Sequence, residues 1–219
     1  MLVKKIRLEL VLLLLCFALS LRAEEIEEYD AGNALIKDIQ TELNMVRSNP
    51  KEYASSILTP RLQRFNGNNY VDEEGKTIET KEGIQAFREC IEVLENTKPL
   101  GKLYMEKGLC LAAQFLADDH AKNSSTGHTA SDGSTPQIRM ERYGFLNGGG
   151  ENWICGSATA RDIVIFLLVD DGVPSRGHRK NILNKDFRKV GIGFSSEHPV
   201  YKTACAMNFA VDYVSDRSL

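Results

Sequence analysis

Three short segments each place a side chain that can bind a metal or carry a proton next to glycine. They are Gly127-His128-Thr129, Gly149-Gly150-Glu151 and Gly177-His178-Arg179. Glycine allows the backbone to turn sharply, and two imidazoles with one carboxylate are suited to a divalent-metal site or to an acid–base pair. We therefore predict that His128, Glu151 and His178 meet at one cleft, and that the rest of the chain is the scaffold that brings them together.

Each of these residues also has a structural interpretation. A loop histidine is more often an exposed hydrogen-bonding group than a ligand, which applies to both His128 and His178. A carboxylate at the mouth of a strand is unfavourable unless it is paired or exposed. Glu151 therefore has the alternative role of binding the backbone or Arg179.

The other chemically capable residues are assigned structural places. His120 lies in a helical pattern beside two aspartates, so we expect it on the surface or behind the site. His198 precedes a proline in a turn and is expected to be structural. Trp153 is expected in the core, because its large ring contributes most when it is buried.

The N-terminus has the pattern of a secretory signal peptide. Basic residues precede an apolar run from Leu8 to Leu21, and small residues follow at its end. The run is about 14 residues, short of the roughly 20 that a membrane span needs, although an uncleaved anchor is the alternative. We expect a signal peptide over residues 1–23 and one secreted, extracellular domain over residues 24–219.

Charge and hydropathy exclude two classes of partner. The chain has 27 basic and 30 acidic residues, and without residues 1–23 it keeps 23 and 29, a net charge of −6. Nucleic-acid binding needs clustered Lys and Arg, so we expect no nucleic-acid partner. The same charge argues against adsorption to anionic lipid. We expect no membrane span after signal cleavage, because no later stretch is long and apolar enough.

Four cysteines remain after residues 1–23, an even number in a secreted context. This pattern predicts two disulfides, and four cysteines allow three pairings. We favour Cys90–Cys110, which would close a short loop between neighbouring helices, and Cys155–Cys205, which would join two strands of one sheet. A cysteine metal site is disfavoured because the sequence has no C-x-x-C pair.

Hydrophobic periodicity places helices and strands along the whole chain. Residues 60–80 are rich in Gly and Asn and predict a loop with a small hairpin. Helices are expected over Asn33–Ser48, briefly after Pro50, from Ile84 with Thr80 as N-cap, over Met105–Lys122, from Pro136 to Tyr143, and over 158–169. Strands are expected over Glu151–Cys155, Arg188–Ser195 and Tyr201–Val211. This order predicts helices on both faces of a central sheet.

With these motifs in order, the sequence resembles the CAP superfamily, also called the SCP or cysteine-rich secretory protein family, and most strongly its bacterial-type pattern. Four segments carry the resemblance, which covers about residues 33–213: Gly127–Pro136, Gly150–Asn152, Gly177–Leu183 and Val190–Gly193. The resemblance implies an α+β fold, a three-layer α/β/α sandwich with a mainly antiparallel central sheet and a surface cleft.

In many relatives the cleft carries two histidines and two acidic residues that hold a divalent cation, for which Zn²⁺ is our first choice. By motif these roles fall on His128, His178 and Glu151. The second acid is Asp170 or Asp171, because this chain has Phe166–Asp171 where animal and plant relatives have Trp-x-x-Glu. The alternative for either aspartate is to cap the preceding helix.

The sequence has no G-x-S-x-G elbow and no H-E-x-x-H helix. We therefore expect a non-enzymatic, monomeric binding module whose cleft holds a cation and whose ligand, by the resemblance, is a lipid, a sterol or a protein surface. The alternative is a metal-assisted hydrolase or peptidase with Glu151 as general base. A third hypothesis is a structural domain whose histidines have no joint role.

Overall fold

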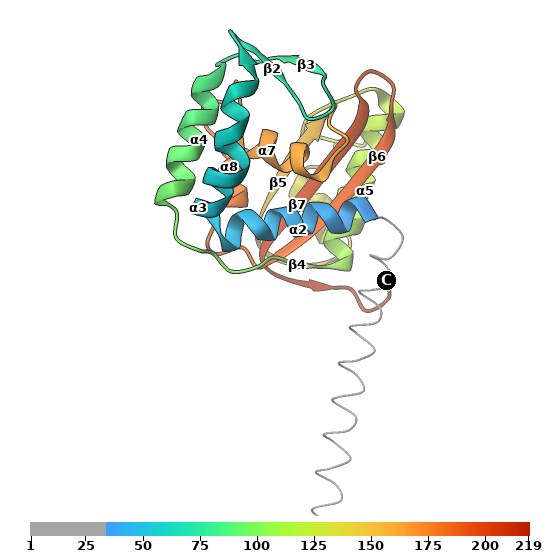
Figure 1. The fold of residues 1–219 in the computed structure, drawn as a ribbon. Coiled ribbons are helices and arrows are strands. Elements are labelled where there is room, and N and C mark those ends of the chain that lie inside the picture. Colours follow the sequence, from blue (N-terminus) through green and yellow to red (C-terminus); the bar gives the residue numbers. More distant parts are fainter. Residues whose placement is uncertain (1–33) are drawn as a thin grey trace, which may run out of the picture. The chain divides into compact units, whose positions relative to one another are not determined.

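The computed structural model describes residues 34–219 (Figure 1). The predicted signal peptide, residues 1–23, lies outside the described residues. Residues Leu35–Leu219 form one compact unit. Within the described part of the chain, every helix is too short or too polar to cross a bilayer.

The central sheet has four strands in the order β4-β6-β7-β5. Its strands are β4 (Tyr104–Met105), β5 (Gly144–Cys155), β6 (Lys189–His198) and β7 (Lys202–Ser215). β7 pairs antiparallel with both β5 and β6, and only the short β4 pairs parallel with β6. The predicted mainly antiparallel sheet is confirmed. β5 begins earlier than the predicted strand and forms one edge of the sheet.

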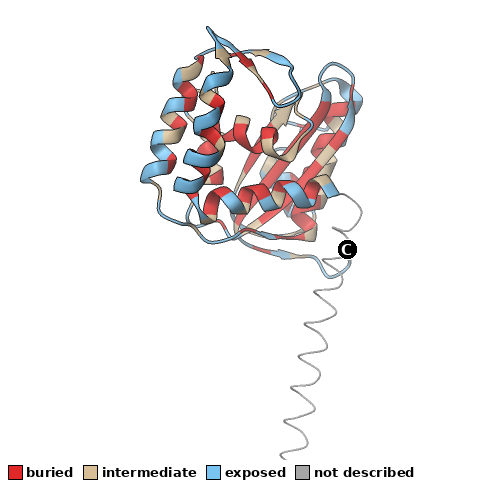
Figure 2. Cartoon of the chain, in the orientation of Figure 1, coloured by how far each residue is buried: buried red, intermediate tan, exposed pale blue. Residues whose placement is uncertain are grey.

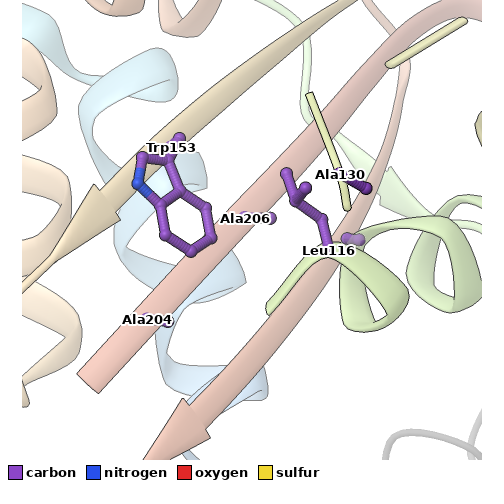
Figure 3. Packing of buried hydrophobic residues seen from close by; sticks show 6 residues of the cluster. Leu116, Ala130, Trp153, Ala204 and Ala206 are labelled. Atoms are coloured by element: carbon purple, nitrogen blue, oxygen red, sulfur yellow. The ribbon is translucent and has the colours of Figure 1, made fainter. Parts of the chain in front are cut away.

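One face of the sheet is covered by α5 (Lys107–Asn123), which lies directly on β6 and β7. A Cβ atom on Gly191 or Gly193 would lie 2.1 or 2.2 Å from backbone atoms of α5, so only glycine permits this close approach. Beside it, Trp153 packs with Leu116 and the small residues Ala130, Ala204 and Ala206 (Figure 3). The prediction that Trp153 belongs to the core is confirmed.

The remaining long helices lie on the other side of the sheet (Figure 1). They are α2 (Ala34–Ser48), α4 (Ile84–Asn96) and α7 (Ala160–Val169), followed by the short α8 (Gly177–Ile182). α7 lies within the helix predicted over 158–169, and its apolar stretch Ile163–Val169 is buried except for Phe166. Figure 2 shows buried residues along α7 and the sheet, and exposed residues on the outer faces of α2 and α4.

The segment after α2 is more regular than a loop. α3 (Pro50–Tyr53) continues into a π-helix, Ala54–Leu58, and a 3-10 helix, Thr59–Arg64. The small hairpin has a third strand, so that β1 (Phe65–Asn66), β2 (Asn69–Val71) and β3 (Thr77–Glu79) form a separate antiparallel sheet. Tyr70 of this sheet packs on Phe87 of α4, with ring centroids 5.1 Å apart.

Two helix starts differ in how they are capped. Thr135 caps α6 (Pro136–Glu141) by accepting a hydrogen bond from the Ile138 N–H, and α6 ends before the predicted Tyr143. The prediction of Thr80 as the cap of α4 is wrong. Gly83 occupies the cap position with φ +63°, and the Thr80 hydroxyl donates instead to the Asn68 carbonyl at 2.6 Å.

The two predicted disulfides are also wrong: none of the cysteines in the described part of the chain is disulfide-bonded. Cys90 lies on α4 and Cys110 on α5, and these helices belong to different layers. In the β5–β7 ladder, Cys155 stands opposite Ala204 and Cys205 stands opposite Ile154. Because successive side chains of a strand point to opposite faces, Cys155 and Cys205 face away from each other across the sheet.

Candidate functional site

The structure brings His128, Glu151, Asp170 and His178 together. The centroids of the two imidazole rings lie 6.2 Å apart with 41° between the ring planes. Nδ1 of His128 is 2.9 Å from Glu151 Oε1, and Nδ1 of His178 is 2.7 Å from Asp170 Oδ1. The four residues therefore form two histidine–carboxylate pairs that stand side by side.

The first pair is built on a loop, a strand and a short helix. His128 is in the loop after α5, Glu151 is on β5, and Arg139 of α6 donates to both Glu151 oxygens at 2.7 and 3.0 Å. The Glu151 side chain is only 1% exposed and that of Arg139 is 0% exposed, whereas the His128 ring is 48% exposed. Arg139 also donates to the His128 carbonyl at 3.0 Å, so it holds the loop as well as the carboxylate.

Arg139 is a residue that sequence reasoning missed. The predicted alternative partner of Glu151 was Arg179, which instead bonds Glu89 and the carbonyls of Leu168 and Val169. The sequence did contain one signal for such a residue. Glu151 was expected at the mouth of a strand, and a buried carboxylate needs a compensating cation. Which arginine supplies the charge depends on how α6 packs against β5.

The second pair is built on the turn between α7 and α8. Asp170 is 3% exposed and ends α7 in the left-handed conformation with φ +57°. Its Oδ2 accepts the backbone N–H of His178 at 2.9 Å, while its Oδ1 meets the ring of the same residue. One carboxylate therefore fixes both the start of α8 and the orientation of the His178 ring, which is 21% exposed.

Asp171 does not belong to the site. Its carboxylate accepts the backbone N–H groups of Lys81 and Glu82, at 2.6 and 2.8 Å, on the opposite side of the turn. The left-handed backbone at Asp170 turns the chain sharply, so the two adjacent side chains point in different directions. The structure thus separates two aspartates that the sequence left as equal candidates.

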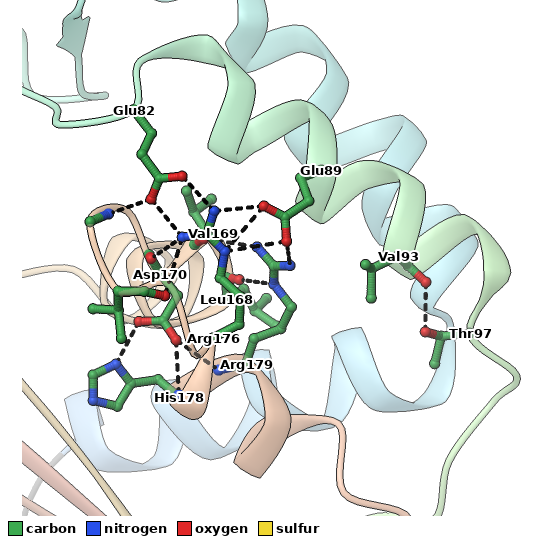
Figure 4. A network of polar contacts seen from close by, with 12 residues as sticks. Glu82, Glu89, Val93, Thr97, Leu168, Val169, Asp170, Arg176, His178 and Arg179 are labelled. Carbon is green, nitrogen blue, oxygen red and sulfur yellow. Dashed lines mark hydrogen bonds and ion pairs between the residues drawn. The ribbon is translucent and has the colours of Figure 1, made fainter.

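A network of charged residues surrounds the second pair (Figure 4). Arg176 bonds Glu82, Glu89 and the carbonyl of Asp170, the last at 2.7 Å, and Arg179 bonds Glu89 at 2.8 Å. Hydrogen bonds from Arg176 hold the pKa of Glu82 at about 2, well below its usual value. The network ties the start of α4 to the turn that carries Asp170.

The two pairs lie on opposite faces of β5. Glu151 and Trp153 point to the α5 side, whereas the intervening Asn152 points to the α8 side. The Asn152 amide donates to the His178 carbonyl at 3.1 Å and accepts from Asn181 at 2.8 Å. The site therefore straddles an edge strand, with one histidine reaching it from each side.

Each ring keeps its second nitrogen free of hydrogen bonds within the described residues. Because Nδ1 of each ring donates to a carboxylate, Nε2 of the neutral ring is an acceptor, and no residue of the described range 34–219 hydrogen-bonds either Nε2. With a Zn–N bond of about 2.0–2.1 Å, an ion lies about 3.2 Å from each ring centroid, so two rings that share a tetrahedral ion have centroids about 5.2 Å apart. The observed 6.2 Å is about 1 Å longer, so the rings would have to close by about that amount to hold a zinc ion between them.

The carboxylates of Glu151 and Asp170 bond the Nδ1 side of the rings, away from the free Nε2 atoms. Within residues 34–219, no group of three or more His, Cys, Asp or Glu side chains is arranged to hold a metal ion directly. A cavity of about 530 Å³ lies between α6 and β5, and its lining includes Met140, Leu146, Gly149 and Glu151 but neither histidine. The role of the predicted residues as metal ligands stays a prediction.

The comparison with protein families gives a match over most of the domain. The model of the cysteine-rich secretory protein family, CAP, matches residues 82–211, more than half of the chain. A relative, the uncharacterized protein YkwD of Bacillus subtilis strain 168, is 24% identical over 128 residues, which are 56% of this chain and 48% of that protein. The chain thus spans about half the length of the curated relative it matches.

Two solved structures are also similar to this chain. An outer surface protein from Borrelia burgdorferi is 23% identical, with 51% of this chain and 78% of that chain covered and a TM-score of 0.42. An extracellular protein containing an SCP domain from Bacillus anthracis strain Ames is also 23% identical, with 57% and 39% covered and a TM-score of 0.41.

Proposed function

The chain belongs to the CAP family of cysteine-rich secretory proteins, and from this premise we propose that it is an extracellular binding module in which His128 and His178 hold a divalent cation. The predicted signal peptide over residues 1–23 supports the extracellular location. The observation that carries the cation site is the arrangement of the two rings, 6.2 Å apart, each with Nδ1 on a buried carboxylate.

In this proposal Glu151 and Asp170 do not bind the cation themselves but support the two histidines that do. A carboxylate that accepts the second ring N–H of a metal-binding histidine fixes the ring's orientation and raises its basicity. This assigns His128 and His178 as the protein ligands and Glu151 and Asp170 as their supports, with Asp171 outside the set. Imidazole nitrogens suit Zn²⁺, and two protein ligands leave positions of a tetrahedral ion open.

The open positions give the module a means of binding a partner. An oxygen or nitrogen atom of an extracellular ligand would complete the coordination of the ion, while the rest of the ligand would lie against the neighbouring surface. The cavity between α6 and β5 supports this arrangement, because it adjoins Glu151 and is lined partly by the apolar side chains of Met140 and Leu146.

The contacts favour binding over hydrolysis. A general base needs a carboxylate oxygen that is open to the substrate. Glu151 Oε1 is bonded by His128 and Arg139, and Oε2 by Arg139. The Asn208 amide, oriented so that its oxygen accepts from the Ala113 N–H, also donates to Oε2 at 3.0 Å. Glu151 therefore serves better as a support for His128 than as a base.

The proposal is tested by calorimetric titration of the purified protein with zinc chloride. We expect binding by the wild type and none by the double variant His128→Ala with His178→Ala. Equal heats for the two proteins would reject the site.

A matched pair of neighbouring substitutions tests the supporting role. Asp170→Asn removes the carboxylate from His178 and should weaken zinc binding by about 10- to 100-fold, the usual effect of losing an outer partner. Asp171→Asn, one residue further on, should leave the affinity unchanged. An equal loss in both variants would show that the turn as a whole, and not the Asp170–His178 bond, sets the affinity.

A further inference from the structure

The segment that carries His128 is short and largely polar, and it follows α5 directly. α5 ends at Asn123, and Ser124 turns the chain with φ +54°. Gly127, immediately before His128, has φ +104°. A segment with two such turns and an exposed ring at its end needs other contacts to keep that ring in one place.

His120, on the last turn of α5, supplies two of these contacts. It is fully buried, with its ring 4.5 Å from that of Trp153. Its Nε2 lies 3.0 Å from the Gly127 carbonyl, which can only accept, so Nε2 carries the proton. Nδ1 is then an acceptor for the Ser125 hydroxyl at 2.5 Å. The prediction left His120 on the surface or behind the site, and the structure places it inside.

His198, at the end of β6, supplies a third contact from a different element. It is 1% exposed, and its Nε2 donates to the Ser125 carbonyl at 3.0 Å. Its Nδ1 accepts the backbone N–H groups of Val200 and Tyr201, both at 3.3 Å. Every nitrogen of the two buried rings therefore has a partner, and three of the four nitrogens bond Ser125 or Gly127.

We propose that His120 and His198 are positioning residues that set where the ring of His128 stands. The chain contains four histidines, and on this proposal all of them serve one site: two face the cation, and two hold the segment from Ser125 to Gly127. The inference rests on the proposed function for its link to cation binding. Holding the segment before the ion arrives lowers the ordering cost of binding.

The test compares side chains of similar size that keep or lose the hydrogen bond. His120→Gln retains an N–H near the position of Nε2, whereas His120→Leu fills the space beside Trp153 without a donor. We expect His120→Leu to weaken zinc binding by about 10-fold or more and to speed amide exchange in residues 125–128. His120→Gln should stay close to the wild type in both measurements. His198→Leu and His198→Gln should show the same contrast.

Ser125→Ala provides a milder change if the leucine variants fail to fold. It removes only the hydroxyl bond to His120 and should give a smaller loss of affinity with faster exchange in the same segment. A merely structural role would lower the unfolding free energy without changing zinc affinity or local exchange. Wild-type affinity and exchange in folded His120→Leu, His198→Leu and Ser125→Ala proteins would overturn the proposal.

The two readouts separate this inference from the proposed function. If the wild type binds no zinc, the cation site fails, but amide exchange in residues 125–128 still decides whether the two buried rings hold the segment. Faster exchange in the leucine variants would then support the holding role alone, and unchanged exchange would reject it.

Discussion

Glu151 and Asp170 are both almost fully buried, and each binds Nδ1 of a histidine, but their negative charges are balanced in different ways. Glu151 faces the guanidinium of Arg139, whose side chain is itself fully buried. Asp170 instead accepts the N–H of His178 at the start of α8, and the arginines around it are shared with Glu82 and Glu89.

This difference shows that the same histidine–carboxylate geometry can be stabilised by one charged residue or by many groups. The His128 side relies on a single buried cation, so one substitution leaves an uncompensated charge. The His178 side relies on backbone groups and a partly exposed network, in which the loss of one ion pair costs little. We therefore expect the two sides to respond differently to mutation and to pH.

The largest expected effect is on the Arg139 side. Arg139→Met should lower the unfolding free energy by about 3–5 kcal/mol, because Glu151 would remain buried without a cation. Glu82→Gln, on the other side, should cost no more than about 1 kcal/mol, since Glu82 is partly exposed and Arg176 keeps its pair with Glu89. Urea unfolding of both variants measures the contrast. Comparable losses would remove the distinction between the two sides.

The second prediction concerns mild acid. Burial lowers the pKa of His120 below its ordinary 6.5, with Asp119 and Glu151 acting in the opposite direction. Between the lowered pKa of folded His120 and the ordinary value of 6.5, this histidine is protonated in the unfolded chain but not in the folded protein. The free energy of unfolding therefore falls as the pH drops below about 6.5. His120→Gln should remove part of this slope. Unfolding free energies at pH 7.5, 6.5 and 5.5 test it, and an identical slope in the variant would contradict it.

Glu82, in the network on the His178 side, should respond only at lower pH. The folded pKa of Glu82 is about 2 against an ordinary 4.5, so its contribution is complete above 4.5 and is lost as the pH falls toward 2. The stability difference between the wild type and Glu82→Gln should therefore be constant from pH 7 to 5 and shrink below 4.5. A difference that already shrinks at pH 6 would show that another group controls this network.

The smallest effect is expected from reductant. Neither side of the site is cross-linked, because the cysteines of the described range form no disulfide. Dithiothreitol should leave the unfolding free energy unchanged, whereas losing a native disulfide typically costs about 2–5 kcal/mol. Thiol titration of the unfolded protein, with and without prior reduction, should give the same count. A lower count without reduction would indicate a disulfide after all.

Much of the fold follows from local pattern. The helical spacing of α2 and α5, the apolar run of α7 and the alternation in β6 and β7 each predict their own element, because hydrophobic periodicity reports which face is buried. The predicted Cys155–Cys205 pairing failed for the complementary reason. It depends on the register of β5 against β7, and a shift of one residue moves a side chain to the other face of the sheet.

The sequence by itself determined that His128, Glu151 and His178 are glycine-flanked groups able to share a site, since residue type and motif order are local properties. Only the tertiary structure decided that Asp170 rather than Asp171 supports His178, that Arg139 rather than Arg179 balances Glu151, and that His120 and His198 lie behind His128. The physical reason is that a buried charge or ring takes the partner that packing places within hydrogen-bond distance. That partner can come from an element far away in the chain.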